Sequence, residues 1–468
     1  MIRAQLSQCR DWVADSTMTA DVAFDGVATD SRTAPAGSLF IALRGEKFDA
    51  HVFLADVAAR GVAAIVAEAG SAAQHLAGLT VPLLLVPDSR RALGEIALGW
   101  RRRFTMPVIG VTGSNGKTTV KEMIAAILVA GVGAEHAMAT RGNFNNDIGL
   151  PLTLLRLDAT TRAAVVEIGM NHPGEIAQLA ALAQPTVALV NNAQREHQEF
   201  MATVEAVAQE NGAVITSLAD DGIAVFPVDE VFTPLWRELA AARGQRRVLG
   251  FGFSADADVR CTHVANAFGS DMAVAAGADR FTVRLAAAGL HNVRNALAAI
   301  ACTRAIGIPV EAIVRGLEAF APVAGRLQRK QAASGAQVID DTYNANPDSV
   351  RAAIEVLAQA GAPRVLVLGD MGEVGDAGTA FHAEIGAYAR ACGIDRLLTL
   401  GSLASASTAA FGLQATHFND IGALQAAVVA LATPAATVLV KGSRFMQMER
   451  VVNHLAQPLP GQQLQDSH

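Results

Sequence analysis

The sequence predicts an α/β protein built from three domains, and three observations lead to this prediction. The chain has 468 residues, which is too many for a single hydrophobic core. Apolar runs of five or six residues alternate with helical patterns, as expected for parallel sheets that helices cover on both faces. A glycine-rich turn, TGSNGKTT, joins one of these strands to a helix and has the form of a phosphate-binding loop.

The strand and helix patterns divide the chain into three zones. Residues 1–84 hold the short strands of GVATDSRTAPAGSLFIAL, an Ala-rich helix and the strands AAIVAE and PLLLVP, which indicate a small α/β domain. Residues 85–323 hold VIGVTG, AAVVEIG and TVALVNN between helices, which indicate a central parallel sheet of the P-loop ATPase type. Residues 324–468 hold QVID, RVLVLGD, RLLTLG and TVLVKG, which indicate a doubly wound, Rossmann-like domain. Ligands of such sheets bind at the carboxyl ends of the strands.

The composition favours packed globular domains and argues against a nucleic-acid surface. Hydrophobic residues make up 51% of the chain and the net charge is −7. The densest basic cluster, WRRRF at 100–104, is interpreted as the exposed end of a helix. Four scattered cysteines without a CxxC pair suggest a reducing compartment and no structural zinc.

The sequence also predicts a soluble, cytoplasmic protein without a membrane span. The first residues, MIRAQLSQCRDW, carry charges where a signal peptide needs an apolar core. Residues 421–440 form an uncharged run, but Gln425, Thr433 and Pro434 interrupt it. We expect this run to form a buried helix followed by a buried strand.

The phosphate loop predicts which atoms meet a nucleotide. Gly113 and Gly116 allow a tight turn that directs backbone N–H groups at phosphate oxygens. Lys117 can reach the β- and γ-phosphates, and the Thr118 hydroxyl can bind Mg²⁺. The common GxxxxGK[ST] spacing places glycine where Val111 stands, so the form here is the shorter TGxxGKTT. Kinases, NTPase motors and ATP-dependent ligases all fit such a loop.

Polar residues at the ends of neighbouring strands suggest a magnesium site. Glu167 ends AAVVEIG, while His197 and Glu199 follow TVALVNN. A carboxylate at this edge is a natural ligand for Mg²⁺, which prefers oxygen, and histidine is a less usual partner. His197 is otherwise an ordinary polar loop residue.

Two further segments suggest contacts with a nucleoside. GLHNVRNALAAIA places His291, Asn292 and Asn295 in the first turn of a helix, where the amides can bind an adenine edge or cap the helix. IDDTYNANPDSV ends a strand with Asp340 and Asp341, which form either an Asx-rich turn or a ribose-binding carboxylate.

With these segments together, the chain resembles the Mur ligase family, the ATP-dependent amino-acid and peptide ligases of cell-wall precursor synthesis. The resemblance covers nearly the whole chain and rests on TGSNGKTT, RGNFNNDIGLPLTLL, EIGMNHPGEI, HNVRNALAAIA, GRLQ and DDTYNANPDSV in this order. TDSRTAPAGSLFIALRGEKFDAHVF, VLGDMGEVG and VLVKGSRFMQMERVV resemble the members that join D-alanyl-D-alanine to UDP-N-acetylmuramoyl-tripeptide. The DNPR signature of the diaminopimelate-adding members is absent from the sequence.

The resemblance implies a protein that uses ATP and Mg²⁺, binds these two small-molecule substrates, and has one domain each for the UDP-sugar, ATP and the incoming amine. We expect a monomer, although the sequence itself does not give the oligomeric state. It implies that ATP contacts Gly113, Ser114, Asn115, Gly116, Lys117, Thr118, Thr119, His291, Asn292, Asn295 and Asp341. It implies catalytic roles for Lys117, Glu167, His197 and Arg326, with Mg²⁺ at Thr118, Glu167 and His197. It implies substrate contacts at Ser31, Arg32, Asn143, Asn145, Asn146, Tyr343, Asn344, Asn346, Lys441, Ser443 and Arg444.

One departure from the family pattern concerns the second magnesium. Many members carry a lysine that is carbamylated and binds this ion, and VAQENGAVI has Asn211 in its place. An amide cannot become a carbamate. The hypothesis is that the protein either manages without this ligand or uses a nearby carboxylate such as Glu210.

Two other classes of protein share parts of the pattern. A folate or cyanophycin-type ligase has the phosphate loop and the HN..N helix, but it is not expected to have the N-terminal TDSR…GSLF module or the terminal KGSR. A P-loop ATPase switch is expected to hydrolyse ATP in response to a protein partner instead of a dipeptide.

Overall fold

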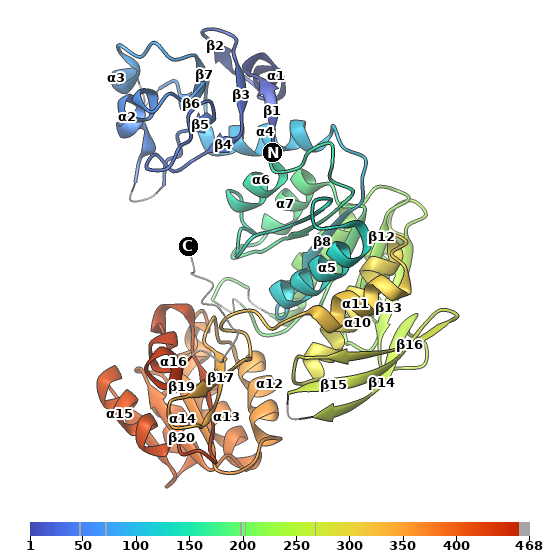
Figure 1. Ribbon diagram of the computed structural model, residues 1–468, viewed down its shortest axis with the longest axis vertical. Coiled ribbons are helices and arrows are strands. Elements are labelled where there is room, and N and C mark those ends of the chain that lie inside the picture. The colour runs from blue at the N-terminus through green and yellow to red at the C-terminus, as the bar shows by residue number, and fades with distance from the viewer. Residues whose placement is uncertain (46–47, 71–72, 197–198, 202, 267, 458–468) are drawn as a thin grey trace.

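The protein has a three-domain α/β architecture, as the sequence predicts. The structure is a computed structural model, and it describes residues 1–45, 48–70, 73–196, 199–201, 203–266 and 268–457. The N-terminal elements lie at one end of the molecule, the central sheet follows, and the C-terminal elements lie at the other end (Figure 1). The boundaries at 84/85 and 323/324 remain predictions.

The N-terminal elements form two small sheets. In the part of this region that the structure describes, five strands lie in the order β2-β7-β6-β5-β4, parallel except for β2, and β1 pairs with β3 antiparallel. The strands are β1 (Arg3–Gln5), β2 (Thr17–Met18), β3 (Ala23–Asp25), β4 (Val27–Ala28), β5 (Leu39–Ile41), β6 (Ala64–Glu68) and β7 (Leu83–Val86). The helices are α1 (Leu6–Trp12), η1 (Ala50–Phe53), α2 (Leu54–Ala59) and α3 (Ala73–Leu76).

The first helix packs on the central part of the chain. Helix α1 contacts α4 (Ser89–Arg101), and the two share one hydrophobic core. A side chain at Gly99 would meet the Trp12 ring at 2.3 Å, so glycine permits this close approach. The first two predicted zones, residues 1–84 and 85–323, therefore share one hydrophobic core across the expected boundary between them.

Among the described residues, the central sheet has nine strands in the order β16-β15-β14-β13-β12-β11-β8-β10-β9. Strands β9 to β14 and β8 are parallel, while β14, β15 and β16 pair antiparallel. The strands are β8 (Val108–Thr112), β9 (Ala137–Ala139), β10 (Ala163–Glu167), β11 (Val187–Val190), β12 (Ile223–Pro227), β13 (Arg247–Gly252), β14 (Val259–Asn266), β15 (Gly269–Ala276) and β16 (Asp279–Leu285). The antiparallel extension was not predicted; its residues alternate between buried and exposed positions because they face a core on one side only.

Helices cover both faces of the central sheet. Helices α5 (Lys117–Val132), α10 (Leu290–Ala305) and α11 (Val310–Ala319) share a core with one face. The opposite face packs on α4, α6 (Gly149–Leu154), α7 (Glu175–Ala183), α8 (Val204–Thr216) and α9 (Thr233–Ala241). Burial on both faces explains the continuous apolar runs of the central strands.

Up to residue 457, where the described part of the chain ends, the C-terminal sheet has seven strands in the order β21-β20-β19-β22-β18-β17-β23. Strands β18 to β22 are parallel, and β17 and β23 extend the edge antiparallel. The strands are β17 (Gln328–Ala332), β18 (Gln337–Asp341), β19 (Arg364–Gly369), β20 (Arg396–Leu400), β21 (Ala415–Phe418), β22 (Thr437–Lys441) and β23 (Ala456–Gln457). The helices are α12 (Pro347–Ala358), η2 (Gly375–Ala377), α13 (Gly378–Ala391), α14 (Ser405–Phe411), α15 (Ile421–Leu431), η3 (Arg444–Met446) and α16 (Glu449–Leu455).

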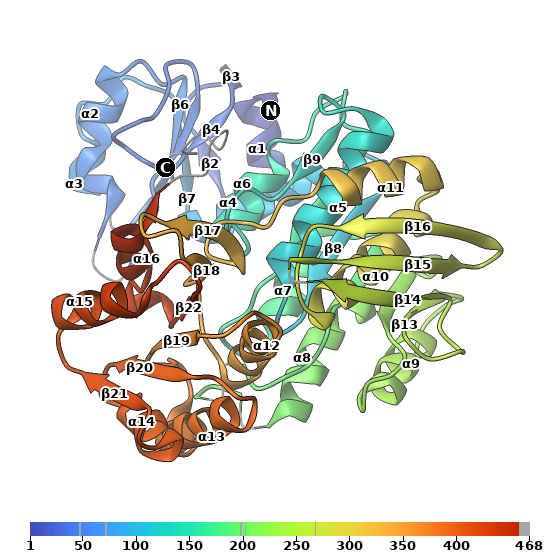
Figure 2. The same ribbon diagram turned by 60° about the horizontal axis from the view of Figure 1, so that its bottom comes forward.

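Helix α12 lies on the side of the C-terminal domain that faces the central domain (Figures 1 and 2). Helices α12, α13 and α14 cover one face of the sheet, and α15 and α16 cover the other. The uncharged run at 421–440 forms helix α15 and most of strand β22, as predicted, and the strand is buried. The expectation of a buried helix is wrong, because only Leu424 and Val428 of α15 are buried and its other face lies at the surface. Among the described residues, no helix combines the length and apolar character that a membrane crossing requires.

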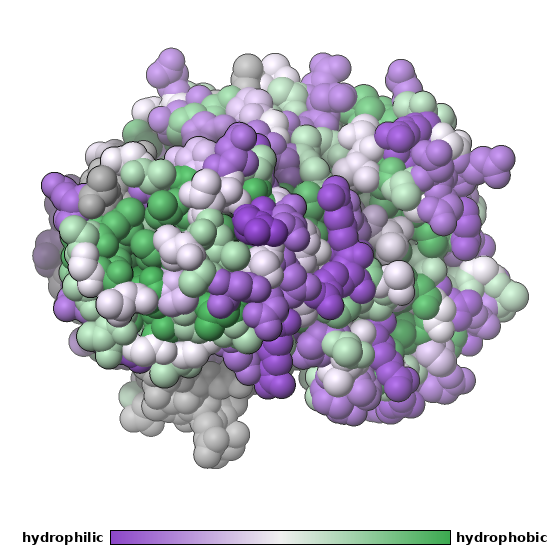
Figure 3. Space-filling view, turned by 90° about the horizontal axis from the view of Figure 1, so that it is seen from above, coloured by the Kyte–Doolittle hydropathy of each residue, from purple (hydrophilic) through white to green (hydrophobic). Residues whose placement is uncertain are grey.

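Seen from the end that carries the N-terminal sheets, apolar residues gather on one side of the surface and polar residues cover most of the rest (Figure 3). Such a mixture is ordinary for a folded domain, because polar atoms cannot cover the whole surface.

Candidate active site

The predicted phosphate loop joins β8 to α5, and its two glycines are required by geometry. Gly113 and Gly116 have φ angles of 133° and 82°. A Cβ atom at Gly116 would lie 2.6 Å from Asn295 Oδ1 and 2.8 Å from Asn191 Nδ2. At Gly113 it would lie 2.9 Å from Asn191 Cβ. Glycine therefore lets the loop turn while packing directly against β11 and α10.

The segment 191–196, called here the β11 loop, holds the phosphate loop in place. The backbone N–H of Asn115 donates to Asn192 Oδ1 at 2.8 Å, and Asn191 Nδ2 donates to the Asn115 carbonyl at 2.8 Å. The N–H of Gln194 donates to Ser114 Oγ at 2.9 Å. Sequence reasoning missed these residues, and the polar run NNAQRE after a buried strand is the signal that could have identified them.

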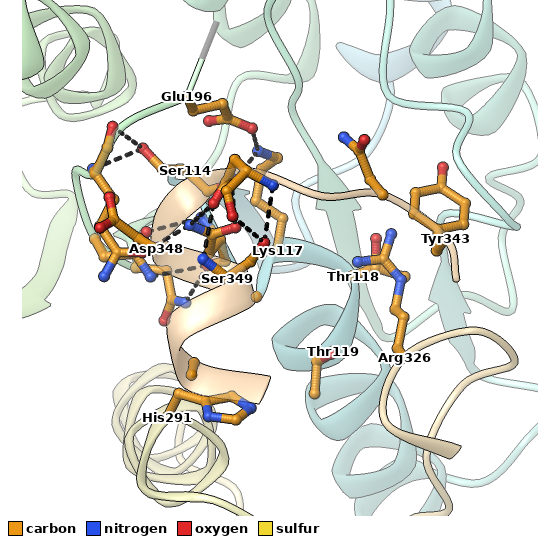
Figure 4. Close-up of a pocket in the computed structure, with 18 of the residues that line it drawn as sticks. Ser114, Lys117, Thr118, Thr119, Glu196, His291, Arg326, Tyr343, Asp348 and Ser349 are labelled. Carbon is orange, nitrogen blue, oxygen red and sulfur yellow. Dashed lines mark hydrogen bonds and ion pairs between the residues drawn. The ribbon is translucent and has the colours of Figure 1, made fainter. Parts of the chain in front are cut away.

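Lys117 lies at the mouth of the loop and is paired with a carboxylate. Its ammonium donates to the carbonyls of Gly113 and Ser114 and forms an ion pair with Glu196 at 2.9 Å. Figure 4 shows Lys117 and Glu196 pointing toward each other. A phosphate at this position would therefore compete with Glu196 for the lysine.

Thr118 and Glu167 meet beside the loop. The Thr118 hydroxyl donates to Glu167 Oε2 at 2.9 Å, and Asn145 Nδ2 donates to Glu167 Oε1 at 2.8 Å. Glu167 is 2% exposed and ends β10, and its backbone N–H is held by Thr140 Oγ1 at 3.0 Å. A hydroxyl and a carboxylate beside a phosphate loop are the oxygen ligands that suit Mg²⁺. The described residues contain no group of three or more His, Cys, Asp or Glu side chains that could hold a metal ion, and His197 lies outside them.

The first two turns of α10 carry the residues expected at the nucleoside. Asn295 accepts from Asn191 Nδ2 at 2.9 Å and donates to Asn292 Oδ1 at 3.1 Å. Asn292 also donates to the Ala288 carbonyl at 2.8 Å, so its amide ties the helix to the residue before the turn. Desolvation lowers the pKa of the neighbouring His291, which keeps its imidazole neutral.

The C-terminal domain supplies the opposite wall. Lys441 donates to Asp341 Oδ2 at 2.6 Å and to the Asn344 carbonyl at 2.8 Å. The guanidinium carbon of Arg326 lies 4.0 Å from the centroid of the Tyr343 ring. Figure 4 shows these two side chains on the same side of the pocket.

Asn115 and Asn346 exchange amide hydrogen bonds that join this wall to the phosphate loop. Asn346 caps α12 and donates its Nδ2 to Asn115 Oδ1 at 2.9 Å. The phosphate loop and the C-terminal domain are therefore in direct contact.

These elements enclose a cavity of about 640 Å³. Its volume lies within the usual range for small-molecule sites. The predicted residues that line it are Ser114, Asn115, Gly116, Lys117, Thr118, Thr119, Asn145, Asn146, Glu167, His291, Asn292, Asn295, Arg326, Asp341, Tyr343, Asn344, Asn346 and Lys441.

Other predicted residues lie away from the cavity lining. Ser31 and Arg32 follow β4 in the N-terminal domain, where Arg32 pairs with Asp30 at 2.7 Å. Asn143 is exposed beside the cavity residue Asn145. Ser443 is buried and donates to the Ala345 carbonyl at 3.1 Å. The largely exposed Arg444 pairs with Glu449 at 3.2 Å.

Glu210 and Asn211, at the position where many Mur ligases carry the carbamylated lysine, make different contacts. Thr112 Oγ1 donates to Asn211 Oδ1 at 2.6 Å, so Asn211 supports the end of β8. The Glu210 carboxylate accepts from the N–H groups of Gly174 and Ile176, both at 2.9 Å, at the start of α7. Both Glu210 oxygens hold a helix N-terminus, which gives this carboxylate a structural role. Its use in place of the missing metal ligand stays a hypothesis.

Family models match three stretches that together cover most of the chain. They are described as Mur ligase family, catalytic domain (residues 23–101), Mur ligase middle domain (residues 111–303) and Mur ligase, glutamate ligase domain (residues 325–444). The chain belongs to the Mur ligase family. The resemblance seen in the sequence is thus confirmed at the level of the family.

Curated relatives extend this Mur ligase match over the whole length. The UDP-N-acetylmuramoyl-tripeptide–D-alanyl-D-alanine ligase of Escherichia coli is 39% identical, with 97% of this chain and 99% of that protein covered. The protein of the same name in Bacillus subtilis is 35% identical, with 92% and 93% covered.

Solved structures agree with this match. A MurF structure from Acinetobacter baumannii has a TM-score of 0.89 at 32% identity, covering 97% of this chain and 98% of that one. A MurF ligase from Thermotoga maritima in complex with ADP has a TM-score of 0.81 at 27% identity, covering 92% and 96%.

Proposed function

We propose that this Mur ligase joins D-alanyl-D-alanine to the terminal carboxylate of UDP-N-acetylmuramoyl-tripeptide and converts ATP to ADP and phosphate in peptidoglycan precursor synthesis. The observation that carries the proposal is the full-length match to relatives of that name. The cavity supports it, because a phosphate loop and the C-terminal domain line the same space. The proposal places the enzyme in the cytoplasm as a monomer.

The proposal assigns one substrate to each domain. Residues 1–84 bind the UDP-sugar, with Ser31 and Arg32 at the end of β4; residues 85–323 bind ATP; residues 324–468 bind the incoming dipeptide. Ser31 and Arg32 support this assignment because they follow a strand of a mainly parallel sheet, where ligands usually bind.

The reaction requires activation because a carboxylate does not form an amide with an amine in water. The tripeptide carboxylate attacks the γ-phosphorus of ATP, ADP leaves, and an acyl phosphate forms. The dipeptide amine then attacks the acyl carbon, loses a proton and expels phosphate. Alignment of bound reactants can supply roughly 7–11 kcal/mol of barrier reduction.

The chain's own residues neutralise charge in the first step. Lys117 and Arg326 line the cavity and can contact phosphate oxygens. Thr118 and Glu167 would hold Mg²⁺, which would balance negative charge on the phosphates. Positioned cations are the main catalytic contribution to phosphoryl transfer.

The test is mass spectrometry of the products from ATP, D-alanyl-D-alanine and each UDP-muramoyl-tripeptide, with phosphate release measured in parallel. We expect ADP and a precursor lengthened by one dipeptide, with no comparable release for lysine, diaminopimelate or glutamate. Lys117→Met should abolish release, while Lys330→Met should retain it because Lys330 pairs with Asp340 outside the cavity lining. Absence of both ADP and the lengthened precursor would refute the proposal.

A further inference from the structure

One arginine of the β11 loop, the segment that holds the phosphate loop, forms ion pairs with the C-terminal domain. Arg195 lies in the β11 loop, and its backbone N–H donates to Asp348 Oδ2 at 2.9 Å. Its guanidinium donates to Asp348 Oδ1 at 2.6 Å and to Glu384 Oε2 at 2.8 Å. Asp348 stands in the first turn of α12, and Glu384 lies on α13. One side chain from the central domain therefore binds two helices of the C-terminal domain.

The contact is partly shielded from water and has a defined geometry. Arg195 and Asp348 are each 23% exposed, and Glu384 is 34% exposed. Hydrogen bonding to Arg195 holds the pKa of Glu384 below its usual range. The guanidinium also lies over the Phe381 ring at 5.3 Å. A fork of donors that meets two carboxylates is specific to arginine, since lysine offers only a point charge.

The sequence neighbours of Arg195 connect this contact to the phosphate loop. On one side, Gln194 bonds to Ser114 and Asn115. On the other side, Glu196 pairs with Lys117. The residues on both sides of Arg195 therefore contact the phosphate loop, so a movement of that loop would be transmitted to Arg195 through its sequence neighbours.

Helix α12 provides a second connection between the phosphate loop and the ion pairs of Arg195. Its cap, Asn346, bonds to Asn115 of the phosphate loop, and Asp348 two residues later holds Arg195. The start of α12 is thus bound both to the phosphate loop and to the β11 loop. In the same segment, Tyr343 and Asn344 line the cavity.

We propose that Arg195 is a positioning residue that couples the nucleotide-binding loop to the C-terminal domain. The inference rests on the proposed function, because it makes Arg195 responsible for bringing the dipeptide-binding domain to the activated carboxylate. Arg195 does not line the cavity among the described residues, and it acts through Asp348, Glu384 and the start of α12. Loss of the fork leaves two carboxylates without their shared partner, which weakens docking of the domain.

The test compares Arg195→Met with Arg304→Met. Arg304 is the matched control, because it also pairs with a carboxylate, Asp279 at 2.5 Å, but both residues belong to the central domain and neither lines the cavity as described. We expect Arg195→Met to lower kcat/KM for D-alanyl-D-alanine at least tenfold and to change the Kd of ADP less than threefold. Arg304→Met should change kcat/KM less than threefold. Arg195→Lys should give an intermediate loss, since it retains the charge but not the fork.

Two further measurements separate coupling from simple instability. Small-angle scattering of the ligand-free proteins should show a larger radius of gyration for Arg195→Met than for Arg304→Met and the wild type. The exchanged pair, Arg195→Asp with Asp348→Arg, should recover part of the lost kcat/KM. If the wild type forms product and Arg195→Met matches it in both kcat/KM and radius of gyration, the inference is wrong. If the wild type forms no product, the proposed function fails, and the scattering comparison still tests the docking contact.

Discussion

Replacing Gly116 by alanine tests whether the phosphate loop depends on close packing against β11 and α10. The residue has φ 82°, and an alanine in this conformation costs about 1–2 kcal/mol. Its Cβ would displace the amides of Asn191 and Asn295, which lie 2.6–3.0 Å from that position. Loss of the hydrogen bond between these buried amides adds about 1–3 kcal/mol. We therefore expect Gly116→Ala to destabilise the loop by roughly 2–5 kcal/mol in total.

The matched control is Gly78→Ala. Gly78 also has φ 82°, but no atom lies within 4 Å of the position that its Cβ would take, so only the conformational cost remains. The difference between the variants isolates the contact with the two amides. Calorimetric titration with ADP should show a Kd roughly 5- to 150-fold weaker for Gly116→Ala, which corresponds to 1–3 kcal/mol, and an unchanged Kd for Gly78→Ala. Equal ADP affinity in both variants, with urea midpoints that also agree, would refute the reasoning.

Two further predictions concern Glu210 and His382. Glu210→Ala removes an acceptor for two N–H groups at the start of α7 and should lower the free energy of unfolding by about 0.5–2 kcal/mol in urea titrations. The Mg²⁺ concentration for half-maximal activity should stay the same, and a large increase would support Glu210 as a metal ligand. Buried His382 accepts from Met371 N–H and contacts the Gly378 carbonyl, and desolvation lowers its pKa. The unfolded state then binds a proton that the folded state does not, so the free energy of unfolding should fall as pH drops below about 6.5. His382→Gln should show a shallower fall, and an identical pH dependence would contradict this assignment.

The sequence predicts well those features that are local along the chain. Helix α5 begins at Lys117 because a buried strand, two glycines and a helical run follow one another without interruption. The run at 421–440 was divided correctly because Thr433 and Pro434 interrupt it between α15 and β22. Such signals require no knowledge of distant partners.

Features that depend on distant partners could not be predicted in this way. Gln194 and Glu196 meet the phosphate loop across 79 or 80 residues of chain, and Arg195 meets Glu384 across 189. Each is one polar residue in a short loop, and only the order of strands in the sheet brings it to its partner. Strands β14 to β16 were missed for a different reason, because a half-buried antiparallel sheet lacks the continuous apolar runs that marked the other strands.

The ion pairs around the cavity indicate which lysines and arginines can bind the phosphates of a nucleotide. Of the lysines and arginines that line it, Lys117 pairs with Glu196, Lys441 with Asp341, Arg294 with Asp229 and Arg351 with Glu384. Within the described part of the chain, Arg326 has no carboxylate partner and rests on the Tyr343 ring. An incoming phosphate can therefore meet Arg326 without breaking an ion pair, whereas it must displace Glu196 to reach Lys117. Since Arg326 and Tyr343 come from the C-terminal side of the cavity and Lys117 from the central domain, full neutralisation of the phosphates requires both domains in place. If Arg195 couples the two domains as proposed, its contact would favour phosphoryl transfer only when the C-terminal domain is docked.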